Sequence, residues 1–315
     1  MKAAQLTRYG GKDAITINED VPEPTLGADE VLVRVHAAGV NPFDYKVQSG
    51  TYQDYFPVTF PAILGGDVSG VVEKIGDDVS GFTVGQEVYG MANAASSRGS
   101  FAELAPVKAV QLSEKPKTTD FTVAAALPLA SVSAYQALVD YIALKPGQKI
   151  LIHGGSGGIG SLAIQIAHSI GAYVATTTSA GDTDFVKSLG ADEVIDYKTQ
   201  DFSELLSDYD AVFDTVGGEP NIKSYTILKK GGTLVSMVQP VDEALEKQYG
   251  ISYVQESTKA TQERFTAITE LVDSGKLVVH VDKTFPLEET AEALEYLKTH
   301  HSIGKVVIVV VPETS

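Results

Sequence analysis

The sequence predicts an α/β protein of two parts, a β-rich domain and a doubly wound parallel sheet inserted into it. The chain of 315 residues is longer than one hydrophobic core usually supports. Residues 1 to about 115 alternate short apolar runs with Gly and Pro turns, which is typical of closely spaced strands in a barrel or sandwich. From residue 149 onward, strand patterns alternate with helical patterns, which indicates βαβ units.

The first domain is marked by strands and tight turns. Apolar residues alternate over residues 31–35, a turn is expected at 76–78, and another strand is expected near 87–89. After Pro116 the composition becomes rich in Ala, and residues 131–142 carry a helical pattern. The sequence therefore predicts a change of architecture near residue 120.

The second domain is expected to alternate strands with helices, and Gly171 and Gly190 end its two clearest helices, as glycine often does. The continuous apolar run at 304–311 is one more strand, which could complete either domain. We therefore expect a discontinuous first domain, residues 1–120 and 285–315, with residues 121–284 inserted as the dinucleotide-binding domain. The expected elements of the inserted domain are strand 149–154, helix 161–171, strand 173–178, helix 183–190 and strands 193–197, 209–217 and 232–238.

Charge and composition exclude several classes of protein. The net charge of −17 argues against a nucleic acid or an anionic membrane as partner, because both are bound through basic surfaces. The chain has no Cys, so it has no disulfide, no thiol nucleophile and no thiolate metal ligand. No apolar run is long enough to span a bilayer, and the first residues do not resemble a signal peptide. We expect a cytoplasmic protein.

A glycine-rich loop is the strongest functional signal. Gly155, Gly157 and Gly160 form G-x-G-x-x-G between a predicted strand and a predicted helix. In that context the glycines allow a tight turn, close approach to a pyrophosphate and close packing of helix on strand. The alternative is an ordinary glycine-rich turn. The predicted pyrophosphate-binding residues are Gly155, Ser156, Gly157, Gly158, Ile159 and Gly160.

The end of the next strand favours NADP(H). An NAD site usually places Asp or Glu about 20 residues after the loop, where residues 176–179 are three Thr and one Ser. Without a carboxylate there, a 2′-phosphate is not repelled. No Lys or Arg lies between residues 173 and 186 to pair with that phosphate, and Asp182 is close. The candidate donors are the hydroxyls of Thr178, Ser179 and Tyr197, although Tyr197 is equally consistent with a packing role.

Taken together, these features resemble the medium-chain dehydrogenase/reductase superfamily, and most closely its zinc-independent quinone (zeta-crystallin-like) and enone oxidoreductase branch. The resemblance covers nearly the whole chain and implies a GroES-like catalytic domain with an inserted Rossmann domain, in a protein that is often a homodimer. It is carried by the motifs at residues 37–50, 60–76, 84–90, 99–105, 124–138, 153–167, 188–197 and 300–310.

Two positions separate the chain from the zinc enzymes of this superfamily. Where those enzymes have a Cys and a His ligand, this chain has Asn41 and Gly66, which cannot replace them in a tetrahedral zinc site. We therefore expect no metal. The resemblance then implies NADPH-dependent hydride transfer to a quinone or an α,β-unsaturated carbonyl. The alternative is a non-catalytic NADPH-binding protein of the crystallin kind.

The resemblance places Asn41 and Lys46 in the active cleft beside the nicotinamide. There Asn41 can donate to a carbonyl oxygen, and Lys46 can stabilise an enolate. The alternative for Lys46 is a solvated surface lysine. Tyr52 can supply a proton or simply pack, and Asp44 is expected to cap a helix.

Further cofactor contacts are implied by the resemblance alone. Ser133 corresponds to a small hydroxyl residue near the nicotinamide ribose or amide, although it can equally line a helix. Val216 and Val238 follow the fourth and fifth strands and pass under the cofactor through backbone contacts, and Gly304 and Lys305 approach the carboxamide.

A second sequence pattern indicates a different family. Tyr225 and Lys229 form Y-x-x-x-K, the catalytic pair of short-chain dehydrogenases. In that family the glycine loop lies near the N-terminus, whereas here a whole β-rich domain precedes it. We interpret the spacing as chance.

Overall fold

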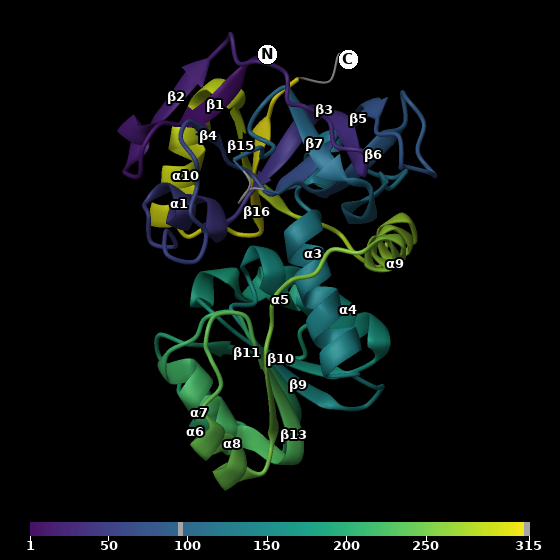
Figure 1. Ribbon diagram of the computed structural model, residues 1–315. Coiled ribbons are helices and arrows are strands. Elements are labelled where there is room, and N and C mark those ends of the chain that lie inside the picture. The colour runs from purple at the N-terminus through teal and green to yellow at the C-terminus, as the bar shows by residue number, and fades with distance from the viewer. Residues whose placement is uncertain (94–96, 312–315) are drawn as a thin grey trace. The chain divides into compact units, whose positions relative to one another are not determined.

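The computed structural model describes residues 1–93 and 97–311 (Figure 1). The chain divides into two compact units. The first unit comprises Met1–Leu129, Ala260–Asp273 and Val279–Ser315, and the second comprises Ala130–Lys259 and Ser274–Val278. A discontinuous β-rich part with a second part inserted is the arrangement that we expected. The predicted domain boundaries lie at 120/121 and 284/285, whereas by contact residues 260–273 and 279–284 belong to the first unit. The predicted boundaries remain a proposal.

The first unit contains two sheets. The order in the larger sheet is β15-β16-β3-β5-β6-β8, with β7 also paired to β3, and the order in the smaller sheet is β2-β1-β4. The strands are β1 Ala3–Leu6, β2 Ile15–Asn18, β3 Glu30–Val40, β4 Ala62–Ile63, β5 Asp67–Ile75, β6 Glu87–Met91, β7 Leu104–Lys108, β8 Leu112–Glu114, β15 Val281–Pro286 and β16 Lys305–Val309.

The long strand β3 organises this unit. It grows from the alternating pattern predicted at residues 31–35 and pairs antiparallel with β5, β7 and β16. The final apolar run of the chain therefore completes the first unit as β16, where Val306 lies opposite Val40. Because the two strands are antiparallel, Lys305, which precedes Val306, and Asn41, which follows Val40, lie at the same end of the strand pair.

Short helices flank these sheets. Helix α1 (Pro42–Gln48) begins directly after β3, with Pro42 in its first turn, where proline is well tolerated because no amide is needed. Helix α9 (Gln262–Asp273) packs in this unit. Tyr89 Oη donates to Phe265 O at 3.0 Å, and the Tyr89 ring packs edge-on against the Phe265 ring. The other helices are α2 Phe121–Ala125 and α10 Thr290–Thr299.

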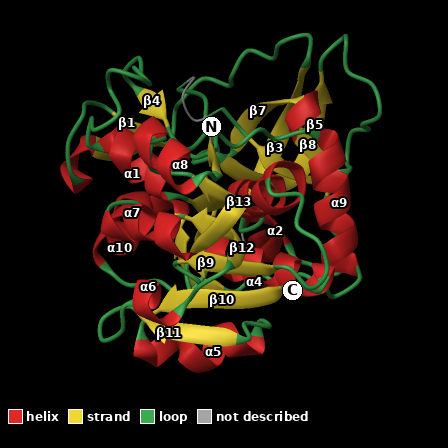
Figure 2. Cartoon of the chain, turned by 90° about the horizontal axis from the view of Figure 1, so that it is seen from below, coloured by secondary structure: helices red, strands yellow, loops and turns green. Residues whose placement is uncertain are grey.

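The second unit is built on one parallel sheet. Its order is β11-β10-β9-β12-β13-β14, and every neighbouring pair is parallel (Figure 2). The chain leaves β9 toward β10 on one side and later returns to β12 on the other, so the strand order reverses between β9 and β12, the place where open α/β sheets usually bind their ligands. The strands are β9 Lys149–His153, β10 Tyr173–Thr178, β11 Glu193–Asp196, β12 Tyr209–Asp214, β13 Leu228–Ser236 and β14 Ser252–Gln255.

The helices of the second unit confirm most of the predicted pattern. Helix α4 (Gly158–Ile170) ends at Gly171, which takes the left-handed conformation with φ of 89°, as predicted. The helix expected at 131–142 begins as α3 (Pro128–Tyr135) and continues as a π-helical turn over Gln136–Tyr141. The others are α5 Thr183–Ser188, α6 Phe202–Leu205, α7 Glu219–Ile227 and α8 Glu243–Tyr249. No helix in the described ranges is sufficiently long and apolar to cross a membrane.

Candidate functional site

The glycine loop joins β9 to α4, as the sequence predicted. The three glycines of the motif differ in the space that a side chain would have. A Cβ on Gly155 would lie 2.1 Å from Thr176 Oγ1, and one on Gly160 would lie 2.2 Å from Gly154 O, so both positions exclude any side chain. A Cβ on Gly157 would meet only Gly154 O, at 3.3 Å. Gly155 and Gly160 are therefore needed for packing, whereas Gly157 has a single close neighbour.

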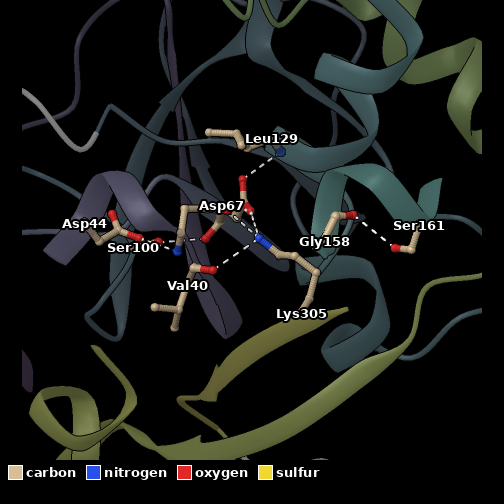
Figure 3. A network of polar contacts seen from close by, with 9 residues as sticks. Val40, Asp44, Asp67, Ser100, Leu129, Gly158, Ser161 and Lys305 are labelled. Carbon is tan, nitrogen blue, oxygen red and sulfur yellow. Dashed lines mark hydrogen bonds and ion pairs between the residues drawn. The ribbon is translucent and has the colours of Figure 1, made fainter. Parts of the chain in front are cut away.

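Helix α4 begins at this loop with free donors. Gly157 is its N-cap residue and no side chain caps the helix. Ser161 N donates to Gly157 O at 3.0 Å, and the Ser161 hydroxyl donates to Gly158 O at 3.3 Å (Figure 3). The amides of Gly158, Ile159 and Gly160 precede these bonds and, as first-turn amides, have no carbonyl partner within the helix. An uncapped N-terminus suits an anion such as a pyrophosphate.

A buried histidine directly precedes the glycine loop. His153 ends β9, and its ring lies 3.0 Å from both the Thr177 and Ser224 hydroxyls. Because Ser224 donates its own proton to Pro220 O, the histidine Nε2 donates to Ser224 and Nδ1 accepts from Thr177. Burial lowers the pKa of His153 to about 4, so the ring is neutral at physiological pH. It links three chain segments without adding charge beneath the loop.

The end of β10 is more acidic than the sequence suggested. The Ser179 hydroxyl donates to the buried carboxylate of Asp182 at 2.9 Å. The Thr178 hydroxyl lies 3.3 Å from the same carboxylate, and its shorter bond, at 2.9 Å, is donated to the Ser156 hydroxyl in the glycine loop. The structure thus brings Ser156, Thr178 and Ser179 together, and both strand-end hydroxyls already have acceptors within the protein.

Two exposed valines lie at the same edge of the sheet. Val216 follows β12 and Val238 follows β13, and their side chains are 55% and 49% exposed. Val216 lies beside Gly154 of the glycine loop, and Val238 lies beside Gly217. Such apolar surface at the carboxyl ends of strands suits the flat face of a cofactor, as the resemblance implied.

Ser133 lies on α3 and is fully buried. Its hydroxyl is 2.7 Å from the Thr258 hydroxyl, a contact within the second unit. The structure therefore gives Ser133 a packing partner, and its predicted contact with the nicotinamide stays a prediction.

In the first unit, three polar side chains form a buried cluster (Figure 3). The Lys305 ammonium contacts Asn41 Oδ1, lies 3.2 Å from Asp67 Oδ2 and donates to Val40 O at 3.2 Å. Asn41 Nδ2 donates to Asp67 Oδ2 at 2.9 Å. Asp67 is fully buried, and Asn41 and Lys305 are 3% and 5% exposed. We name Asn41, Asp67 and Lys305 the buried cluster.

The buried cluster is well satisfied. Asp67 Oδ1 accepts the Leu129 amide at 2.8 Å, and the Ser100 hydroxyl donates to Asp67 O at 2.7 Å. A buried ion pair is stable only when such additional hydrogen bonds complete it. Both ends of the Asn41 amide are held here, which fits a residue that positions the start of α1.

Asp44 caps α1, as the sequence indicated. Its carboxylate accepts a hydrogen bond from the backbone N–H of Asn41 at 2.8 Å, and its side chain is buried. Burial raises the pKa of Asp44 to about 7, and the nearby Asp67 charge adds to the rise. The Asn41 and Gly65 amides and the Lys305 charge oppose it. Asp44 therefore exchanges its proton near neutral pH.

This pKa predicts a pH-dependent stability. The folded pKa of about 7 exceeds the unfolded value of about 3.9, so the folded chain holds a proton that the unfolded chain releases. The contribution of Asp44 is fully present below about pH 4 and is lost as pH rises through about 7, with a limiting slope of about 1.4 kcal/mol per pH unit. Asp44→Asn should remove that slope, because the amide cannot ionise while its oxygen still accepts from Asn41. Urea unfolding across this range tests it, and identical pH slopes in both proteins would contradict it.

Lys46 and Tyr52 meet near the end of α1. Lys46 Nζ donates to Tyr52 Oη at 3.3 Å, and both side chains are half-buried. The Tyr52 ring packs against Phe43 and Phe56, at centroid distances of 5.8 and 6.2 Å. The structure thus pairs two of the predicted catalytic residues and holds the tyrosine by aromatic contacts. A cation beside a phenol hydroxyl is suited to proton donation, because the ammonium stabilises the phenolate that remains.

Two family models match the chain, the alcohol dehydrogenase GroES-like domain over residues 27–117 and the zinc-binding dehydrogenase over residues 189–308. The chain is 37% identical to the 2-methylene-furan-3-one reductase of Solanum lycopersicum, over 99% of this chain and 80% of that protein. It is 36% identical, with the same coverage, to the NADPH-dependent alkenal/one oxidoreductase of Arabidopsis thaliana. The quinone oxidoreductase structure from Coxiella burnetii matches with a TM-score of 0.91 at 33% identity, over 98% of this chain and 99% of that one.

The chain belongs to the medium-chain dehydrogenase/reductase superfamily, in its quinone and enone oxidoreductase branch. The predicted family and the predicted GroES-like and Rossmann architecture are confirmed. One matching model is named for zinc, yet the described residues contain no group of three or more His, Asp or Glu that could hold a metal. The resemblance implies that related zinc enzymes have their ligands at the positions of Asn41 and Gly66, the residue before Asp67. In this chain the Lys305 ammonium contacts both Asn41 and Asp67.

Two predicted positions have a different setting from the one expected. Gly304 has φ of 78°, and a Cβ there would lie 2.3 Å from His280 O, so it is needed for the turn before β16. Lys305 points into the buried cluster, so its predicted approach to the carboxamide remains untested.

Asp67 was missed from the sequence, although its place directly after Gly66 was a usable signal. The Y-x-x-x-K pattern does not lie on one helix, because α7 ends at Ile227 and Lys229 is in β13.

Proposed function

We propose that the chain is an NADPH-dependent reductase that transfers hydride, without zinc, to a quinone or an α,β-unsaturated carbonyl. The observation that carries the proposal is the glycine loop, which leaves the first turn of α4 uncapped and Gly157 with a single close neighbour. The substrate class is supported by the named relatives, which are reductases of a 2-methylene-furan-3-one, of alkenals and alkenones, and of quinones. These names also favour a catalytic protein over a purely NADPH-binding one.

The residues of the second unit fit the cofactor. The amides of Gly158, Ile159 and Gly160 would bind the pyrophosphate, and Gly157 leaves room for it. Val216 and Val238 would provide apolar surface at the strand ends. NADPH, when bound, supplies the hydride that the reduction consumes.

The residues of the first unit supply the proton. Reduction of an enone or a quinone leaves an enolate or a phenolate that must take up one proton. The Tyr52 hydroxyl donates it, and the Lys46 ammonium at 3.3 Å stabilises the tyrosinate that remains until solvent restores the proton. The buried cluster and Asp44 fix the start of α1, the helix that carries Lys46. In this proposal Asn41 is a positioning residue.

NADPH oxidation tests the proposal. The purified protein is incubated with NADPH and a panel of simple quinones, alkenals and alkenones, before and after treatment with a chelator. We expect turnover of at least one class and no loss after chelation. The absence of turnover with every acceptor, together with tight NADPH binding, would instead support the crystallin-like alternative. Stoichiometric zinc whose removal abolishes activity would contradict the zinc-independent mechanism.

Substitution of Lys46 and Tyr52 separates chemistry from binding. We expect Tyr52→Phe to lower kcat by about 100-fold or more, which is typical for loss of a general acid, and Lys46→Ala to lower it by about tenfold. NADPH affinity should change little in either variant. Tyr55→Phe is the matched control, because Tyr55 is 80% exposed and lies three residues away. Equal kcat values for Tyr52→Phe and Tyr55→Phe would remove Tyr52 from the mechanism.

A cytoplasmic homodimer completes the proposal. The location is supported by the acidic, cysteine-free composition, and the dimer by the resemblance to a branch that is often dimeric. Cell fractionation tests the first, and light scattering coupled to gel filtration tests the second.

A further inference from the structure

The predicted 2′-phosphate site has no positively charged residue on the strand β10 or in the turn that follows it. The Ser179 hydroxyl donates to Asp182 and the Thr178 hydroxyl donates to Ser156, each at 2.9 Å, so neither proton is free and the Asp182 carboxylate lies beside both residues. A phosphate brought to the end of β10 would meet that negative charge. A cation is needed nearby if the second unit is to favour NADPH, and none occurs between residues 173 and 186.

The neighbouring strand supplies one. Strand β11 runs parallel to β10, with Asp196 opposite Thr178. The pairing continues past the strand end, because Tyr197 N donates to Thr178 O at 3.2 Å. The residues after β11 therefore emerge at the same edge of the sheet as those after β10. Lys198 is the second of them.

The two strand-end segments are tied together by one carboxylate. Asp196 accepts the Lys198 amide at 3.1 Å and the Thr199 hydroxyl at 2.8 Å. The Ala180 backbone also donates to it, and these hydrogen bonds, led by that of Thr199, hold the pKa of Asp196 below its usual value. Lys198 is thus fixed through its backbone to the segment that contains Ser179 and Asp182.

The Lys198 ammonium is available. It lies 5.8 Å from the centre of the exposed Tyr197 ring, and no ion pair within 4 Å involves it in the described part of the chain. Tyr197 and Lys198 also line a pocket of about 340 Å³, whose other lining residues come from 199–202 and from Glu219, Pro220 and Lys223 rather than from β10 or the glycine loop. The other lysine of this pocket, Lys223, is neutralised by Asp201 and Glu219 at 2.6 and 2.8 Å.

We propose that Lys198 is the residue that selects NADPH over NADH, by pairing its ammonium with the 2′-phosphate beside the Tyr197 hydroxyl. This inference rests on the proposed function. The missing cation then comes from the segment after β11, the strand next to β10. The pairing also explains how the second unit accepts a 2′-phosphate despite Asp182.

Cofactor titrations of Lys198→Gln test it. We expect the Kd for NADPH to rise about tenfold, as for loss of a charge-assisted hydrogen bond, while the Kd for NADH changes by less than about twofold. The same variant should lose affinity for adenosine 2′,5′-bisphosphate and not for 5′-AMP. Lys198→Arg should keep the preference. Lys187→Gln is the matched control, because it removes the same charge from an exposed lysine in the last turn of α5.

The outcomes separate this inference from the proposed function. If the unaltered protein binds NADPH and Lys198→Gln leaves the ratio of the two Kd values unchanged, Lys198 is not the selecting residue and the reductase proposal stands. If Lys187→Gln shifts the ratio as much as Lys198→Gln, the effect is one of net charge and the inference fails. If the unaltered protein binds neither cofactor, the proposed function itself fails.

Discussion

Gly157→Val should abolish NADPH binding while the protein stays folded. A Cβ at Gly157 meets only Gly154 O, at 3.3 Å, so a small local shift accommodates the side chain. The branched methyl groups would then occupy the space in which the backbone has to approach the pyrophosphate. We expect the Kd for NADPH to rise at least about 100-fold, since the cradle contributes several hydrogen bonds to charged oxygens.

A second glycine of the same loop provides the contrast. A Cβ at Gly160 would lie 2.2 Å from Gly154 O and 2.9 Å from Gly155 Cα, both backbone atoms that cannot give way. Gly160→Val should therefore destabilise the second unit itself. Thermal unfolding and fluorescence titration with NADPH distinguish the two variants. If Gly157→Val is folded and binds NADPH with unchanged affinity, the loop is only a turn and the proposed function loses its basis.

The glycine loop could be predicted because its signals are local. The pattern, the strand before it and the helix after it lie within about 25 residues, and the helix and strand periods are legible there. The sequence did not say which glycine serves which purpose. That distinction depends on Thr176 Oγ1 and Gly154 O, the atoms that fill the space around Gly155 and Gly160.

The buried cluster could not be predicted in the same way. Lys305 and Asp67 are 238 residues apart, and they meet because β16 and β5 both flank β3. The register of Val306 opposite Val40 sets Lys305 beside Asn41, and no pattern within either segment encodes it. The resemblance implied where the zinc ligands of related enzymes would lie, but the contact between Asp67 and Lys305 requires the folded sheet.

The adenosine end of the site shows the same limit. Thr178 and Ser179 lie at the end of β10, yet the bond of Ser179 to Asp182 depends on the turn that leads into α5, and the bond of Thr178 to Ser156 depends on the glycine loop. Lys198 follows β11, and no pattern along β10 shows that these two parallel strands end at the same edge. Residues from neighbouring strands can be combined only when the sheet order is known.

Lys305→Met should lower the free energy of unfolding by about 3–5 kcal/mol, the range for breaking a buried ion pair on one side. Asp67 is fully buried, and in this variant its carboxylate would keep hydrogen bonds from Leu129 and Asn41 but lose its counter-charge. Methionine is close in size to the lysine stem, so little of the effect should come from packing. Lys74→Met is the control, because Lys74 pairs with Glu23 on the surface and exposed pairs contribute about 0–1 kcal/mol.

A double variant isolates the charge. Lys305→Met combined with Asp67→Asn removes both charges while the amide oxygen still accepts from Leu129, so much of the lost stability should return. Urea unfolding of the unaltered protein, both single variants and the double variant measures the coupling between the two side chains. A loss below about 1 kcal/mol in Lys305→Met would mean that the ion pair does not hold the start of α1. Asn41 would then owe its orientation to the cap with Asp44 alone.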